Sequence, residues 1–290
     1  MKPIDTSPTV YRGEYSFGTI ECRFKDFPYQ NVFSELFDFE RTRLGIRRAA
    51  NYIFFFKGAP PKQRYALDLN GKTLSLGQPS QLLGLFDSIL DRLIRQHTSK
   101  GTCTMHAAST AIGGNCFSFV GRSGSGKTTL ATTFALHYGR TILGDEYAVF
   151  NYETGTIAHE RYPLMLKRNS PLLSNIGIEN AVPFTISEKT ETYAVSYSQV
   201  HLEREQRELP LRALIFPHHN ENIEQAAIKY VSLTNLHRFL LPSIGSTSSR
   251  TNLYKAILDC ISCNKIQLIQ IEYNCANEAS PKLADLILKQ

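Results

Sequence analysis

Long apolar runs are missing from this 290-residue sequence. Its most apolar cluster, residues 52–56, is far shorter than the roughly 20 residues that a membrane-spanning helix needs. The opening stretch, MKPIDTSPTVYRGEYSF, has no apolar core of signal-peptide length. We therefore expect a cytoplasmic protein without a membrane partner.

Basic clusters are missing as well. The net charge is only +6, and the lysines and arginines are spread along the chain rather than gathered into runs. Proteins that bind nucleic acids usually carry such runs or a basic stripe, so we expect no nucleic-acid partner. A mild positive charge is equally suited to nucleotides and to acidic peptides.

Cysteine is too scarce for a disulfide scaffold, with six residues in a chain of this length. Cys260 and Cys263 form one C-x-x-C, but neither a second C-x-x-C nor an H-x-x-H is present to complete a metal site. Helical spacing places both thiols on the face that carries Leu253 and Ile257. We expect two core cysteines there, because a free cysteine behaves as a small buried hydrophobe.

The apolar pattern divides the chain near residue 100. Before that point it predicts strands and an amphipathic helix over 79–96, whose wide apolar stripe we expect to pack against the following domain. After it, the pattern predicts a strand hairpin, a helix that ends at Gly139 and further strands, with no assignment for 161–210. We predict an α+β domain over 1–100 and an α/β domain over 101–290. The predicted strands are those at EYSFGTIECRF, NYIFFF, YALDL, CTMHAASTAI, CFSFVG, RTILGDEYAVFN, LRALIFP and QLIQIEY.

The sequence does contain a phosphate-binding loop. Residues 121–128, GRSGSGKT, match G-x-x-x-x-G-K-[ST] at every fixed position. The glycines let successive backbone N–H groups point at phosphates, and a helix starting near Lys127 adds the positive end of its dipole. Lys127 supplies charge for the β- and γ-phosphates, and the Thr128 hydroxyl can ligate Mg²⁺. The predicted nucleotide-binding residues are Gly121, Ser123, Gly124, Ser125, Gly126, Lys127, Thr128 and Thr129.

Two adjacent carboxylates, Asp145 and Glu146, follow at the end of an apolar run. The residues between Lys127 and Asp145 are used up by a loop, one helix and a turn, so we expect the acids to return close to the loop. One could bind magnesium while the other takes a proton from an incoming hydroxyl. The alternative is a solvated pair at a strand end. No L-S-G-G-Q segment, the signature of transporter ATPases, lies between the loop and the acids.

His106 precedes the loop by one strand. A hairpin that pairs its strand with CFSFVG would carry the imidazole toward the same edge of the sheet as the acids. The alternative is a structural histidine, which is the commoner fate of a lone one.

The segment over 104–150, from the His-Ala-Ala pattern through the phosphate loop to the acidic pair, resembles the core of the HPr kinase/phosphorylase family and its smaller HPr-kinase-like relatives. The resemblance continues weakly through YPLMLKRNS and LPLRALIFP, and the first hundred residues carry no matching motif. It implies an α/β fold with a P-loop kinase core of the HPr kinase type, preceded here by the small α+β domain.

The resemblance also implies roles for individual residues. It makes Asp145 the catalytic acid/base, places Glu146 on the magnesium side and sets His106 beside Asp145. Lys127, identified from the loop motif, completes the predicted catalytic set. Glu146 departs from the family's usual Asp-Asp pair, and Thr128 stands where serine is commoner. The second signature segment of the full enzymes, associated with phosphorolysis, is not found, so the reverse reaction is not expected.

Three functions stay open at this point. The first is an ATP- and Mg²⁺-dependent kinase acting on a serine hydroxyl of a peptide or small protein, since the resemblance includes kinases of lasso-peptide precursors. The second is a non-catalytic nucleotide sensor, and the third a small-molecule hydroxyl kinase. Arg161, Lys167 and Arg168 are candidates for a cation near the transferred phosphate, with a solvated basic face as the alternative. Homo-oligomerisation is left open.

Overall fold

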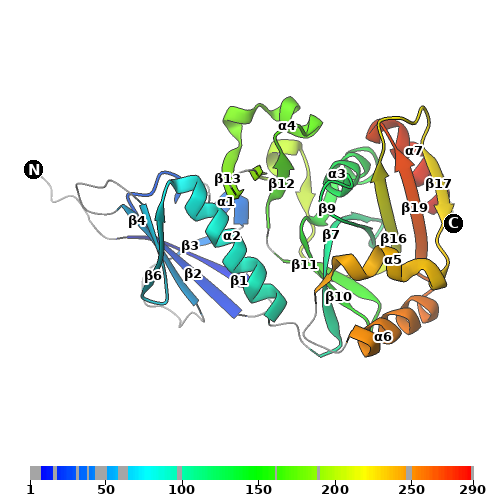
Figure 1. Cartoon of the computed structure of the whole chain (residues 1–290), viewed down its shortest axis with the longest axis horizontal. Helices are drawn as coiled ribbons and strands as arrows, with labels where there is room; N and C mark the ends of the chain where they lie inside the picture. The colour runs from blue at the N-terminus through cyan, green and yellow to red at the C-terminus, as the bar shows by residue number, and fades with distance from the viewer. Residues whose placement is uncertain are drawn as a thin grey trace, which may run out of the picture.

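Two sheets of unequal size form most of the molecule, with a small third sheet between them (Figure 1). The computed structural model describes residues 8–15, 18–30, 33–37, 39–42, 51–57, 65–96, 100–160, 162–187, 190–245 and 250–288. The fold is mixed α/β, as expected from the sequence. No helix in these ranges is long and apolar enough to cross a membrane.

The first sheet lies entirely before residue 100. Its strand order is β3-β1-β2-β4-β5-β6, antiparallel except for the parallel pair β2–β4. The predicted strands at NYIFFF and YALDL are confirmed as β4 and β5. The elements are β1 (Thr9–Tyr15), β2 (Gly18–Lys25), α1 (Phe33–Phe37), β3 (Glu40–Thr42), β4 (Asn51–Lys57), β5 (Tyr65–Leu69), β6 (Lys72–Gly77) and α2 (Pro79–Gln96).

An aromatic core lies between this sheet and helix α2. The rings of Phe24 and Phe55 stack with centroids 5.0 Å apart, and Phe37 meets Phe86 of α2 edge-on at 5.1 Å. The same core also takes in residues far along the chain, among them Phe184. The apolar stripe of α2 therefore covers its own sheet and also packs against the later part of the chain, as its width indicated.

The second sheet is large and mixed. Its order is β15-β9-β7-β10-β11-β16-β19-β17, with β18 on β7 and β8 between β7 and β16. The predicted hairpin is confirmed, because β7 and β8 pair antiparallel. The strands are β7 (Thr102–Ile112), β8 (Asn115–Val120), β9 (Thr141–Gly144), β10 (Tyr147–Asn151), β11 (Thr156–His159), β15 (Glu203–Arg204), β16 (Leu209–His219), β17 (Ala227–Tyr230), β18 (Ile244–Gly245) and β19 (Gln267–Tyr273).

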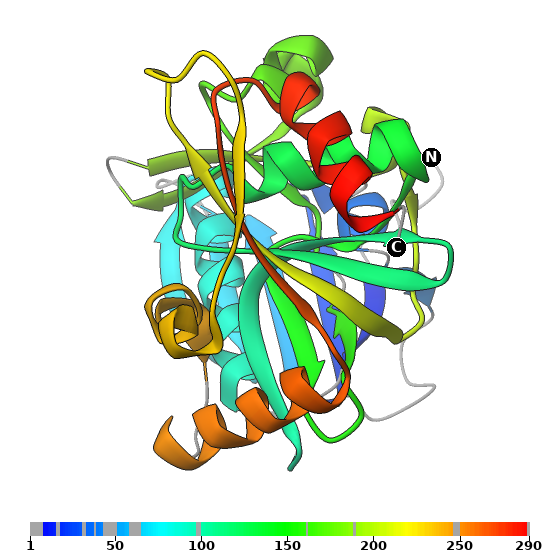
Figure 2. The ribbon, with the colours of Figure 1, turned by 90° about the vertical axis from the view of Figure 1, so that its right-hand side faces the viewer.

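Helices cover both faces of this sheet (Figure 2). Helices α3 (Lys127–Tyr138) and α7 (Ala276–Ile287) pack on one face, and α5 (Leu236–Leu240) and α6 (Arg250–Cys263) on the other. The expectation of two core cysteines on α6 is half right. Cys260 is buried, but Cys263 is exposed because it lies in the last turn of the helix, beyond the edge of the core.

A three-stranded antiparallel sheet occupies the region that the sequence pattern left unassigned. It has the order β12-β14-β13, formed by β12 (Leu164–Lys167), β13 (Val182–Ser187) and β14 (Thr190–Val195), with helix α4 (Pro171–Ile176) beside it. Strand β12 faces two cores: Leu164 and Leu166 enter a cluster with α3 and β9, whereas Met165 joins the aromatic core under α2. These short strands gain their stability from such neighbours, so local periodicity reveals little of them.

Candidate active site

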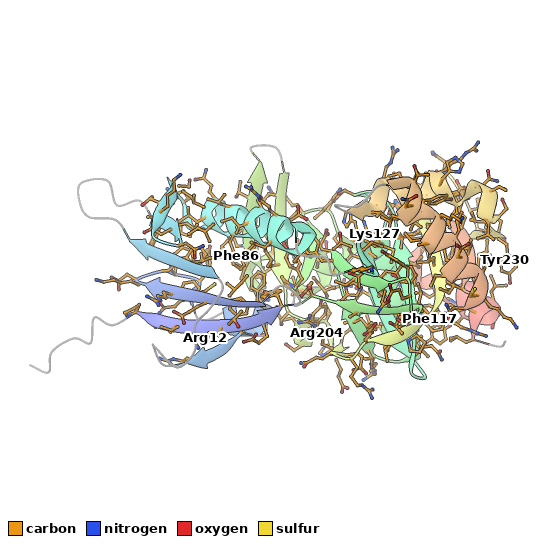
Figure 3. All side chains as sticks on the ribbon, turned by 90° about the horizontal axis from the view of Figure 1, so that it is seen from below. Arg12, Phe86, Phe117, Lys127, Arg204 and Tyr230 are labelled. Atoms are coloured by element: carbon orange, nitrogen blue, oxygen red, sulfur yellow. The ribbon has the colours of Figure 1, made fainter. Side chains whose placement is uncertain are left out.

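The glycine loop starts where β8 ends, in the interior of the large sheet, and runs directly into helix α3. Figure 3 marks this place by Lys127, the first residue of the helix. Gly124 and Gly126 adopt φ angles of +85° and +89°, which favour glycine. A side chain on Gly126 would overlap the ring hydroxyl of Tyr273, and that hydroxyl donates a 2.9 Å hydrogen bond to the Gly126 carbonyl. Strand β19 therefore stabilises the loop through the side chain of Tyr273.

Several polar groups of the glycine loop are available to bind a ligand. The N-terminal cap of α3 is Gly126, which has no side chain to satisfy the first N–H groups of the helix. The Ser125 hydroxyl is buried, and within the described residues it has no hydrogen-bond partner. Unsatisfied donors at a helix N-terminus form an anion site, so the loop fits the phosphates of a nucleotide.

Lys127 is a buried cation, with only 5% of its surface exposed. Its ammonium donates to the carbonyl of Arg122 at 3.2 Å. Burial lowers the pKa of Lys127, the nearby carboxylates Glu146 and Asp145 raise it, and Lys167 lowers it. A lysine held by one neutral carbonyl is ready to exchange that partner for a phosphate oxygen.

Asp145 is completely buried and lies against the start of α3. The hydroxyl of Thr128 donates to its two carboxylate oxygens at 3.0 and 3.1 Å, and the N–H of Met165 donates at 3.2 Å. Burial and the charge of Glu146 raise the pKa of Asp145, while Lys127 and the two hydrogen bonds oppose the rise. The expectation that the acids return to the loop is confirmed for Asp145.

Glu146 pairs with the histidine. The Nε2 atom of His106 lies 2.7 Å from a Glu146 carboxylate oxygen, and both side chains are about a quarter exposed, at 24% and 26%. The resemblance implied that His106 stands beside Asp145, and here the structure differs. His106 lies opposite Tyr147 in the β7–β10 register, which brings it next to Glu146.

The two carboxylates lie together in a short interruption between strands β9 and β10. The single strand expected over 140–151 is wrong: β9 ends at Gly144 and β10 begins at Tyr147, and both pair with β7. Glu146 takes a left-handed φ of +66°, which costs a residue with a side chain about 1–2 kcal/mol. Such strain is concentrated at functional sites, and here it sends neighbouring carboxylates to different partners.

Helix α2 contributes a carboxyl group that the sequence analysis missed. Asp87 is only 9% exposed, and its pKa is raised to about 7 by burial, by Glu146 and by Asp91. Asp91 in turn hydrogen-bonds Tyr147, which begins strand β10. The signal available in the sequence was two acids four residues apart on the margin of an apolar stripe. The predicted N-terminal domain therefore reaches the acidic pair.

The three basic residues predicted to lie near the transferred phosphate, Arg161, Lys167 and Arg168, differ in their positions. The ammonium of Lys167, at the end of β12, lies 3.2 Å from the position that a β-carbon on Gly124 would occupy. Arg168 instead approaches Glu191, with 3.9 Å between the charged atoms. Arg161 lies outside the described residues. Of the described pair, it is Lys167 that the structure brings to the loop.

The donor set fits magnesium. The Thr128 hydroxyl and the Asp145 carboxylate are hard oxygen donors in direct contact. Among the described residues no group of three or more His, Cys, Asp or Glu side chains could hold a metal ion by itself. Mg²⁺ is usually bound by one or two carboxylates together with substrate phosphates, and Thr128 and Asp145 supply oxygen donors of that kind.

No protein-family model matches the chain.

Proposed function

We propose that this protein is an ATP- and Mg²⁺-dependent kinase with a P-loop core of the HPr kinase type, which transfers the γ-phosphate to a serine hydroxyl of a peptide or small protein. One observation carries the proposal. Lys127 and Thr128 at the start of α3, His106 on β7, and Asp145 and Glu146 between β9 and β10 come together at the glycine loop. A nucleotide sensor needs the first two, but it has no use for a strained, partly exposed carboxylate held by an imidazole.

The contacts favour a different division of work between the acids from the one that the resemblance implies. Asp145 has no exposed surface and touches Thr128, the hydroxyl that ligates magnesium in P-loop proteins. Thr128 and Asp145 would therefore hold Mg²⁺, which when bound would neutralise charge on the phosphates. Glu146 is partly exposed, so an acceptor can reach it.

Phosphoryl transfer then needs only one proton transfer. The acceptor oxygen forms a bond to the γ-phosphorus while the bond to the β–γ bridging oxygen breaks, leaving ADP. The hydroxyl proton passes to Glu146, which His106 orients through the 2.7 Å contact. Lys127 supplies fixed positive charge to the phosphates throughout. The choice of a peptide serine as acceptor rests on the resemblance of residues 104–150.

Replacing Lys127 tests the proposal. With labelled ATP and Mg²⁺, the wild-type protein should label a serine in a pool of peptides, whereas Lys127→Ala should label none and bind ATP more weakly. Lys255→Ala, an exposed lysine on α6, is the matched control and should behave as wild type. Equal affinity and turnover in the Lys127 variant would overturn the assignment of the loop. Binding without labelling, for peptides and for small hydroxyl compounds alike, would favour the sensor.

A further inference from the structure

Lys167 lies beside the glycine loop, which already contains one lysine, Lys127. Its ammonium lies over Gly124, at the 3.2 Å separation from the β-carbon position given above. Among the residues that the structure describes, no hydrogen bond or ion pair involves its side chain. Lys127 feels its charge. Lys167 is exposed, so its ammonium is free to move toward a ligand, and an anion bound at the loop would be attracted by both lysines.

The position of Lys167 is set by the strand that also holds Asp145. The N–H of Met165, two residues earlier on β12, donates to the Asp145 carboxylate. Leu164 and Leu166 are buried in a core with helix α3, and Lys167 pairs with Thr192 of β14. Strand β12 is therefore held by Asp145, by the core under α3 and by β14, and the backbone from which Lys167 extends is anchored.

We infer that Lys167 is a second phosphate-binding cation, which contacts the β- and γ-phosphates of the bound nucleotide across Gly124. The inference rests on the proposed function, because it names the ligand as a nucleoside triphosphate. Lys127 and Lys167 together neutralise a polyphosphate better than either alone, and both donors then remain in place as charge develops on the β–γ bridging oxygen. Gly124 keeps the path between Lys167 and the phosphates open.

Binding of a phosphate series tests this inference. Affinities for ATP·Mg²⁺, ADP and AMP would be measured by titration calorimetry for wild type, Lys167→Ala, Lys167→Arg and Arg168→Ala. A lost charge-assisted hydrogen bond is worth about 1.5–3 kcal/mol, so Lys167→Ala should bind ATP about 10- to 150-fold more weakly. AMP binding and the melting temperature should not change. Lys167→Arg should recover most of the ATP affinity, and Arg168→Ala should behave as wild type.

Other outcomes separate this inference from the proposed function. If Lys167→Ala binds ATP as tightly as wild type, or if it loses AMP affinity to the same extent, the role of Lys167 is refuted. Equal losses in Lys167→Ala and Arg168→Ala would also refute it, because the effect would then be general charge. If the wild type binds no nucleotide, the assignment of the loop is wrong, and so is the phosphate-binding role of Lys167. If the wild type binds ATP but labels no acceptor, only kinase activity fails, and the ATP-against-AMP difference still tests Lys167.

Discussion

The two regions of this molecule each bury a carboxylate completely, and they treat it in opposite ways. Glu21, in the N-terminal sheet, accepts hydrogen bonds from Arg12 at 2.5 and 2.8 Å and from Arg23 at 2.7 Å. Asp145, beside the glycine loop, accepts its hydrogen bonds from a hydroxyl and a backbone N–H. Two guanidinium groups neutralise the first charge permanently, whereas the second keeps neutral partners that a ligand can replace.

The same contrast extends to the packing around each region. The N-terminal core is built on large rings such as Phe24, Phe55 and Phe86. In the large sheet the ionisable groups gather where elements end, at the start of α3 and in the break between β9 and β10. In Figure 3 the labels Arg12 and Phe86 mark the N-terminal region, and the label Lys127 marks the region of the large sheet. The Glu21 carboxylate, paired with two arginines, stabilises the fold. The Asp145 carboxylate, bonded to neutral donors, can bind a ligand.

The largest expected effect is on turnover, when the two acids beside the glycine loop are replaced. Glu146→Gln removes the proposed base, so turnover should fall by about 10²–10⁴-fold, and extra Mg²⁺ should not restore it. Asp145→Asn weakens the proposed magnesium contact, so its turnover should recover in part as Mg²⁺ is raised. The measurement is a magnesium titration of turnover for both variants. Rescue of Glu146→Gln, with none for Asp145→Asn, would return the roles to those that the family resemblance implies.

Stability should respond to the two buried carboxylates with opposite signs. Glu21→Gln removes a completely buried charge from Arg12, whose side chain is only 11% exposed, and breaking a buried ion pair costs up to about 3–5 kcal/mol of unfolding free energy. Asp145→Asn keeps the hydrogen-bonded shape and removes a charge that burial disfavours, so at pH 8 it should raise the unfolding free energy. Urea denaturation of both variants measures the difference. A comparable loss in Asp145→Asn would mean that its charge also serves the fold.

The buried Asp87 should make the unfolding free energy depend on pH. Its pKa is raised from 3.8 to about 7, so between these values the folded state binds more protons than the unfolded state and the unfolding free energy falls as pH rises. Asp87→Asn cannot ionise. It should therefore stabilise the protein by up to about 4 kcal/mol at pH 8 and by less at pH 5.

Thermal melting of Asp87→Asn at the two pH values checks this prediction. Asp26→Asn, an exposed carboxyl with the same loss of charge, is the control and should shift the melting temperature little at either pH. A stabilisation independent of pH would contradict the buried, ionising Asp87.

Local patterns predicted much of the framework. Helix α2, strand β19 and the β7–β8 hairpin lie where periodicity put them, because each element is long or ends in turn residues. The sheet of β12, β13 and β14 was missed, since its short strands depend on packing against α2 and α3. Cys263 was misassigned because helical spacing says on which face a residue lies, but not where the neighbouring core ends.

The sequence was sufficient to locate the glycine loop, with Lys127 and Thr128, and to predict that an acid returns beside it, because a loop, a helix and a return strand have limited lengths. It did not assign partners. That His106 pairs with Glu146, that Asp145 faces Thr128, that Asp87 reaches the site from α2 and that Lys167 lies over Gly124 all depend on strand register and on a left-handed residue at the break. Those features arise from contacts between segments far apart in sequence, and no local pattern encodes them.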